Sequence, residues 1–306
     1  MKNTLIVENS FLTAHILSMA FGLVGILLVL PNAEFLTRLT QFGQIALAWS
    51  MAGGGVIYIL LGTIAVSIYA YRVWGTWHWL GFMLPAISIS LTSELLGTST
   101  GFPFGHYHYL SGLGYKIAGL VPVTIPLSWF YLGFSAYVIA RVSLATVSSS
   151  QSYQYLGAIF LGAILLTSWD FVLDPAMSQT DVPFWYWDQP GAFFGMPYQN
   201  FAGWLGTSIL FMGVATLIWR FKPMTIDNKS LELPLAIYLS NFAFATIMSL
   251  ASGIYTPIYI GLILGVLPIL ILYQLAQSTP KKSQLEGTND LTNATESFGL
   301  RGNKVK

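Results

Sequence analysis

The chain has 306 residues, of which 55% are hydrophobic, 15% aromatic and only 8% charged, whereas a soluble domain carries about 25% charged residues. This composition cannot cover a water-facing surface, so we predict a helical membrane protein. The net charge of +1 leaves no basic field to bind nucleic acid, and the absence of cysteine excludes disulfides, thiolate metal sites and cysteine nucleophiles.

Eight apolar runs are long enough to cross a bilayer as helices, since about 17 to 25 apolar residues span its hydrocarbon core. In chain order they cover about 10–30, 44–71, 79–97, 119–141, 153–170, 203–221, 234–251 and 254–275. We therefore predict an all-α polytopic membrane fold with about eight transmembrane helices over residues 1–276. The polar residues 277–306 are expected to form a flexible tail.

The positions of the cations indicate how the helices are oriented. With eight spans, all 13 Lys and Arg residues except Arg38 and Lys116 fall on the side of the two termini. Because cytoplasmic loops carry an excess of Lys and Arg, both termini are predicted to be cytoplasmic. The two long connections, 98–118 and 171–202, then lie on the opposite face, and their length marks them as functional segments rather than simple turns.

Five carboxylates share that face, with few cations to neutralise them. Glu94 lies near the end of the predicted third helix, Asp170 at the end of the fifth, and Asp174, Asp181 and Asp188 follow in the connection. An ionised carboxylate next to hydrocarbon costs about 2.5 to 3.5 kcal/mol at a helix centre. We therefore expect Glu94, Asp170 and Asp174 to be neutral acids that can donate a proton. A helix cap or a bond to loop backbone is the alternative for each, and Asp181 and Asp188 are expected to face water.

Two histidines, His106 and His108, alternate in the segment HYHY. Such a pair is a weak signal for a metal, and we favour a relay of protons to the carboxylates, with an ordinary interfacial position as the alternative. The four histidines of the chain are too few for the histidine boxes of membrane di-iron oxygenases. The sequence therefore predicts no metal and no redox cofactor.

The second long connection and the helix after it are rich in aromatic residues, which include Trp185, Trp187, Phe194 and Trp204. Trp and Tyr also form ordinary belts at membrane interfaces, but here they alternate with carboxylates and glycines, which favours a shaped wall. Aromatic faces attract cations by about 0.5 to 2 kcal/mol. Such a wall would suit a site where a carbocation forms.

Several ordered motifs together resemble one known family. They are Glu94 with Gly97, Gly101-x-Pro103-Phe104-Gly105-x-Tyr107-x-Tyr109, Gly119-x-Val121-Pro122-x-x-Ile125-Pro126-x-x-Trp129, Asp170-x-x-x-Asp174-Pro175-x-Met177, Trp185-x-Trp187, and Phe194-Gly195-x-Pro197-x-x-Asn200-Phe201-x-Gly203-Trp204. Over about residues 85–275 the chain is similar to the CruF family of membrane carotenoid hydratases, which includes cyanobacterial γ-carotene 1'-hydroxylases and archaeal bisanhydrobacterioruberin hydratases. The pattern departs at Phe193 and Phe194, where a tyrosine is expected.

The resemblance implies a carotenoid substrate held in the lipid bilayer of a plasma or thylakoid membrane. It implies addition of water across the terminal C-1',2' double bond of an acyclic ψ-end group, of the γ-carotene or lycopene type, to give a C-1' tertiary hydroxyl. A carotenoid glycosyltransferase acting on that hydroxyl is a further implied partner. Hydration of an alkene needs a proton donor, shielding of a cation and one water, and no cofactor.

For this reaction we expect an acid and base pair made of Glu94 with Asp170 or Asp174, and His106 or His108 as the relay. The expected substrate-binding residues are mostly aromatic and are Tyr107, Tyr109, Trp185, Trp187, Phe194, Asn200 and Trp204.

Two other functions stay open. A proton-coupled transporter of a lipophilic isoprenoid also uses intramembrane carboxylates, but it predicts them near the bilayer midplane on broken helices. A binding scaffold for such a lipophile would need the aromatic wall without the acids.

Overall fold

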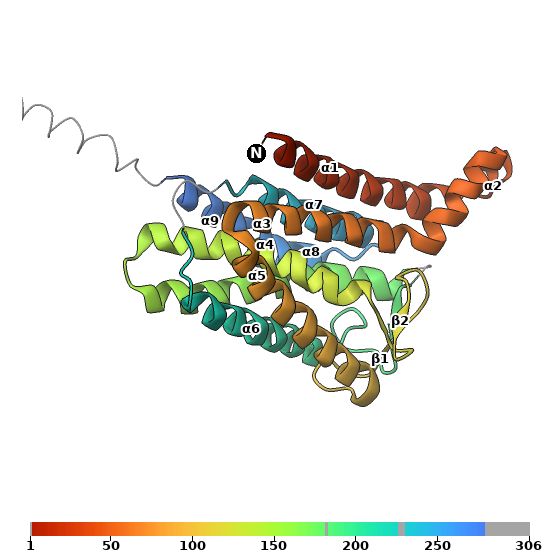
Figure 1. Ribbon diagram of the computed structural model, residues 1–306. Coiled ribbons are helices and arrows are strands. Elements are labelled where there is room, and N and C mark those ends of the chain that lie inside the picture. Colours follow the sequence, from red (N-terminus) through yellow and green to blue (C-terminus); the bar gives the residue numbers. More distant parts are fainter. Residues whose placement is uncertain (1, 181–182, 226–229, 279–306) are drawn as a thin grey trace, which may run out of the picture.

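The computed structural model describes residues 2–180, 183–225 and 230–278 (Figure 1). Asp181 and the predicted tail beyond residue 278 lie outside the described residues. In the described part, helices make up nearly all of the regular structure and are joined by two small two-stranded sheets. The prediction of an all-α fold is confirmed, while the cytoplasmic placement of the termini stays a prediction.

The helices pack side by side in one bundle (Figure 1). In chain order they are α1 (Lys2–Val24) with the π-helical turn η1 (Gly25–Val29), α2 (Ala33–Arg38), α3 (Gln41–Thr100), α4 (Thr124–Val147), α5 (Gln151–Gln179), α6 (Tyr198–Arg220), α7 (Glu232–Ala251), α8 (Thr256–Gly261) with the turn η2 (Leu262–Val266), and α9 (Leu267–Gln277). Of the 18-residue apolar stretch within Thr124–Val147, 83% is buried, against 17% of the corresponding stretch within Asn3–Val29. Helix α4 is therefore central, and α1 lies at the edge.

Seven helices of the described chain are long and apolar enough to cross a membrane, whereas the sequence indicated eight spans. The difference lies in α3, whose 60 residues contain both the second and the third predicted span. Gly75 interrupts the helix with φ 79° and ψ 178°, a conformation essentially restricted to glycine because it has no Cβ. The chain turns back at this point (Figure 1), so the two parts of α3 pack on the bundle separately.

The two long connections meet at one end of the bundle, where β1 and β2 are labelled in Figure 1. Strand β1 (Tyr107–Tyr109), in the first connection, pairs antiparallel with β4 (Trp185–Trp187), in the second, and β2 (Lys116–Ile117) pairs with β3 (Val121–Pro122). Alternate residues of a strand point to opposite faces. Tyr107 and Tyr109 therefore share the face of β1 that turns into the bundle, and His108 lies on the other.

Candidate active site

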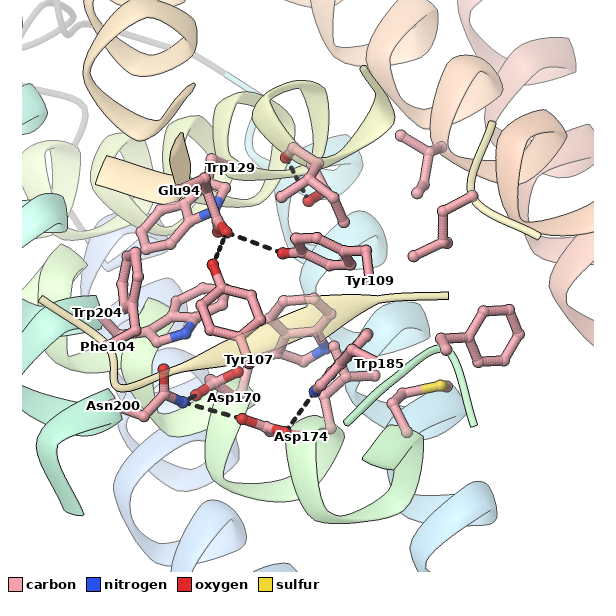
Figure 2. Close-up of a pocket in the computed structure, with 18 of the residues that line it drawn as sticks. Glu94, Phe104, Tyr107, Tyr109, Trp129, Asp170, Asp174, Trp185, Asn200 and Trp204 are labelled. Carbon is pink, nitrogen blue, oxygen red and sulfur yellow. Dashed lines mark hydrogen bonds between the residues drawn. The ribbon is translucent and has the colours of Figure 1, made fainter. Parts of the chain in front are cut away.

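A narrow cavity lies inside the bundle behind β1 and β4. Helices α3, α4, α5, α6 and α7 and both long connections supply its wall. Its strongly polar side chains gather together and are Glu94, Asp170, Asp174 and Asn200 (Figure 2). Most of the remaining wall is apolar or aromatic, and we call this space the inner cavity.

Asp170 and Asp174 both project from α5 into the inner cavity. The predicted end of this helix near residue 170, with Asp174 in a connection, is wrong, because α5 continues through Pro175 to Gln179. A membrane helix tolerates proline where its neighbours compensate the lost backbone bond. Residues four apart on a helix share a face, so this extension brings the two carboxyl groups together. Each residue is only 2% exposed.

Asn200, in the first turn of α6, joins the two aspartates. Its Nδ2 donates to Asp170 Oδ2 at 2.8 Å and to Asp174 Oδ2 at 3.0 Å (Figure 2). The other oxygen of Asp174 accepts from the indole nitrogens of Trp185 at 2.7 Å and Trp187 at 3.2 Å. One amide therefore holds both carboxyl groups, and two tryptophans of β4 orient one of them.

Glu94 reaches the inner cavity from the last part of α3. Its Oε2 accepts hydrogen bonds from the hydroxyls of Tyr107 and, at 2.9 Å, Tyr109, and its Oε1 accepts from Trp129 Nε1 at 3.0 Å. Burial raises the pKa of both tyrosines well above the ordinary phenol value, and the charge of Glu94 adds to the effect. Both tyrosines therefore remain hydrogen-bond donors.

The three carboxyl groups differ in how well their ionised forms are supported. Hydrogen bonds to a carboxylate favour its charged form, and burial in apolar surroundings favours the neutral one. Glu94 has three donors, Asp174 has two indoles and a share of Asn200, and Asp170 has only its share of Asn200. No Lys or Arg lines the inner cavity. Asp170 is therefore the group best suited to carry a proton.

Tryptophan rings form much of the remaining wall. Trp185, Trp187 and Trp204 lie there, together with Tyr107 and Tyr109, so the structure brings these predicted binding residues and Asn200 to one cavity. Sequence reasoning did not single out Trp129, Trp169 and Phe104, which also line it. Trp129 and Phe104 belong to the motifs quoted above, and this membership was the signal that could have identified them. Trp169 has no such signal except that it directly precedes Asp170.

Three predicted site residues lie outside the inner cavity. His106 and Phe194 are exposed, and His108 lies on the outer face of β1, where its Nε2 is 3.2 Å from Asp188 Oδ1. Neither histidine contacts Glu94, Asp170 or Asp174, so the expected proton relay has no supporting contact. Asp188 is itself exposed. Within the described residues, no three His, Asp or Glu side chains are placed to hold a metal ion.

Fold and site together define a polytopic helical membrane protein with a buried cluster of carboxyl groups inside an aromatic cavity. The profile of the carotenoid biosynthesis protein family matches residues 54–268. The chain belongs to this family, and the resemblance to membrane carotenoid hydratases is confirmed. The matched segment includes all four polar residues of the inner cavity.

One curated relative carries a more specific name. The chain is 29% identical to the bisanhydrobacterioruberin hydratase of Haloarcula japonica over 230 residues, which cover 71% of this chain and 66% of the relative. The chain thus spans just under two thirds of that relative. No solved structure matches the chain.

Proposed function

We propose that this protein is a carotenoid hydratase that adds water across the terminal C-1',2' double bond of an acyclic ψ-end group, as in γ-carotene or lycopene. The observation that carries the proposal is the set of three buried carboxyl groups, with no cation beside them, facing an aromatic cavity. Family membership and the name of the relative support it.

The reaction needs one proton, one water and no change of oxidation state. The carboxyl proton of Asp170 passes to C-2', the π bond breaks, and a tertiary cation forms at C-1'. The oxygen of a water molecule then bonds to C-1', and Asp174 accepts the proton that this water loses. Return of a proton from Asp174 to Asp170 restores the site, and Asn200, which bonds both groups, keeps them in place for that transfer.

The other groups of the cavity stabilise the cation. Glu94, held by three donors, supplies a fixed negative charge, and a preorganised charge in a water-excluded site stabilises an opposite charge more strongly than it would in water. The faces of Trp129, Trp187 and Trp204 add the attraction of aromatic rings for cations.

The inner cavity also separates polar from apolar contacts. Asp170 and Asp174 lie on α5 beside Asn200 of α6, Glu94 reaches in from α3, and the rest of the wall includes Tyr58, Ile59 and Phe244. A polyene entering among these apolar residues would place its terminal double bond at the acids. Its remaining length would stay in hydrocarbon.

The test is production of the protein in bacteria that make lycopene or γ-carotene, followed by mass analysis of the carotenoids. We expect a product heavier by one water. The single variants Asp170→Asn and Asp174→Asn should lower its yield at least about a hundredfold, as expected when a proton-transfer group is lost, and Glu94→Gln should lower it as well because the preorganised charge is removed. The matched control is Glu34→Gln, at an exposed ion pair with Arg38 on α2, which should leave the yield unchanged.

Normal yield from all three cavity variants would contradict the proposal. Binding of carotenoid without any change of mass would identify a scaffold instead.

A further inference from the structure

A second cavity, which we call the outer cavity, lies against the site on its solvent side. Its lining is largely polar or exposed and includes Thr100, His106, Asp188, Gln189 and Gln199. Trp187 lines both the outer and the inner cavity. Among the described residues, Trp187 is the one that the two linings share.

Trp187 is held firmly in this position. It is 8% exposed, its nitrogen donates to Asp174, and its ring centroid lies 5.1 Å from that of Tyr107. Gly105, with φ 108°, packs against it so closely that an added Cβ would lie 3.3 Å from the indole and 3.0 Å from Pro197. The indole is thus held by Gly105, by Tyr107 of β1 and by Asp174 of α5, while the next residue, Asp188, is exposed.

We propose that Trp187 is the gate through which water reaches the carboxyl groups from the outer cavity. This inference rests on the proposed function, because a hydratase must take up one water for each turnover. Bilayer hydrocarbon cannot supply that water, and the apolar wall would not retain it. A water that passes Trp187 meets Asp174 first, which is the proposed acceptor of its proton. The closed indole meanwhile keeps bulk water away from the acid and the cation.

The absence of natural cysteine allows a test that does not depend on catalysis. Ser128 lines the inner cavity and is 8% exposed, so Ser128→Cys reports access to it from water. The probe is a charged, water-soluble methanethiosulfonate. Because a close-packed indole blocks such a reagent, we expect Trp187→Ala to raise the labelling rate of Ser128→Cys about tenfold or more. Ser135→Cys, fully buried on the same helix and outside both cavities, should stay unlabelled in both backgrounds.

If Trp187→Ala leaves the labelling rate of Ser128→Cys unchanged while Ser135→Cys stays unlabelled, the proposal that Trp187 is a gate is wrong. If Trp187→Ala also makes Ser135→Cys reactive, the variant has lost its packing, and a second experiment with Trp187 intact decides the matter.

That experiment plugs the outer cavity. Gln199→Cys, exposed on its wall, is coupled to a bulky maleimide, and hydration is measured before and after coupling. We expect the rate to fall about tenfold, because an ordered route for water is blocked. The same treatment of Thr37→Cys, exposed on α2, should have no effect. An unaltered hydration rate after coupling at position 199 would contradict the proposed route for water. Faster labelling of Ser128→Cys in the Trp187→Ala background, without any hydrated product from the unchanged protein, would contradict the proposed function but still support the gate.

Discussion

The indole rings of Trp129 and Trp204 lie face to face, with 3.9 Å between ring centroids and 18° between their planes. Trp129 belongs to α4 and donates its N–H to Glu94 of α3, while Trp204 belongs to α6. One stacked pair therefore links three helices and fixes the direction in which the Glu94 carboxyl group points.

Loss of this stack should weaken both the fold and the site. We expect Trp204→Ala to lower the free energy of unfolding by about 0.5–1.5 kcal/mol beyond the loss of buried area, and to slow hydration because Trp129 no longer holds Glu94 in one position. Trp204→Phe should recover part of both. Thermal unfolding of the detergent-solubilised protein and product yield are the measurements. Trp49→Ala, at a ring 73% exposed, is the control and should change neither.

Asn200 offers a second test, because it alone bonds both aspartates. Asn200→Leu removes the shared donor, and the loss of a hydrogen bond to a charged group amounts to about 1.5–3 kcal/mol. We expect hydration to fall by roughly ten- to a hundredfold and the unfolding temperature to fall as well, because the lost bond is buried. Product yield per folded protein is the measurement. A rate equal to that of the unchanged protein would show that Asn200 does not position the aspartates.

Alkaline pH tests the phenols around Glu94. The folded protein retains the protons of Tyr107 and Tyr109 at a pH where the unfolded chain releases them, because their pKa values are raised by burial and by Glu94. Their contribution to stability is complete below about pH 10 and is lost as the pH rises from there through the raised pKa values. Unfolding temperatures should therefore fall above about pH 10 less steeply in Tyr109→Phe than in the unchanged protein. Identical slopes would contradict this assignment.

A buried ion pair gives a prediction about stability alone. Arg72 of α3 donates to both oxygens of Glu8 on α1, at 2.6 and 2.9 Å, and the Glu8 side chain is 2% exposed. Glu8→Ala leaves a partly buried guanidinium without its partner and should cost about 3–5 kcal/mol of stability. The double variant Glu8→Leu with Arg72→Met should lose less. The first part of α1 lies at the end of the bundle away from β1 (Figure 1), so hydration per folded protein should not change in either variant.

The helices were predictable because the length and hydrophobicity of the apolar runs determine them, and most of the cavity residues were predictable from the carboxyl groups, the aromatic segment and the motifs. Glu94 and Asp170 stood out since carboxyl groups are rare near hydrocarbon. Contacts between segments that lie far apart in the sequence were harder to predict. The pairing of β1 with β4 turns His108 outward and Tyr107 inward, and the alternation HYHY does not indicate which pair faces the cavity.

Helix ends were the other source of error. Pro175 was expected to lie beyond the end of a helix, yet α5 passes through it, because packing in a bundle can outweigh the loss of one backbone bond. The reversal at Gly75, by contrast, falls between the second and third predicted spans. The continuation through Pro175 depends on neighbours that the sequence does not reveal.

In the described residues, the buried acids of the inner cavity form a single group, Glu94, Asp170 and Asp174. A rod-shaped molecule with a reactive double bond at each tip can offer only one tip to these acids at a time. To be modified twice it must leave, invert and be captured again. The mono-alcohol should therefore accumulate before the diol. The ratio of the two alcohols should depend on how fast the carotenoid reorients in the lipid, and not on the acidity of the carboxyl groups.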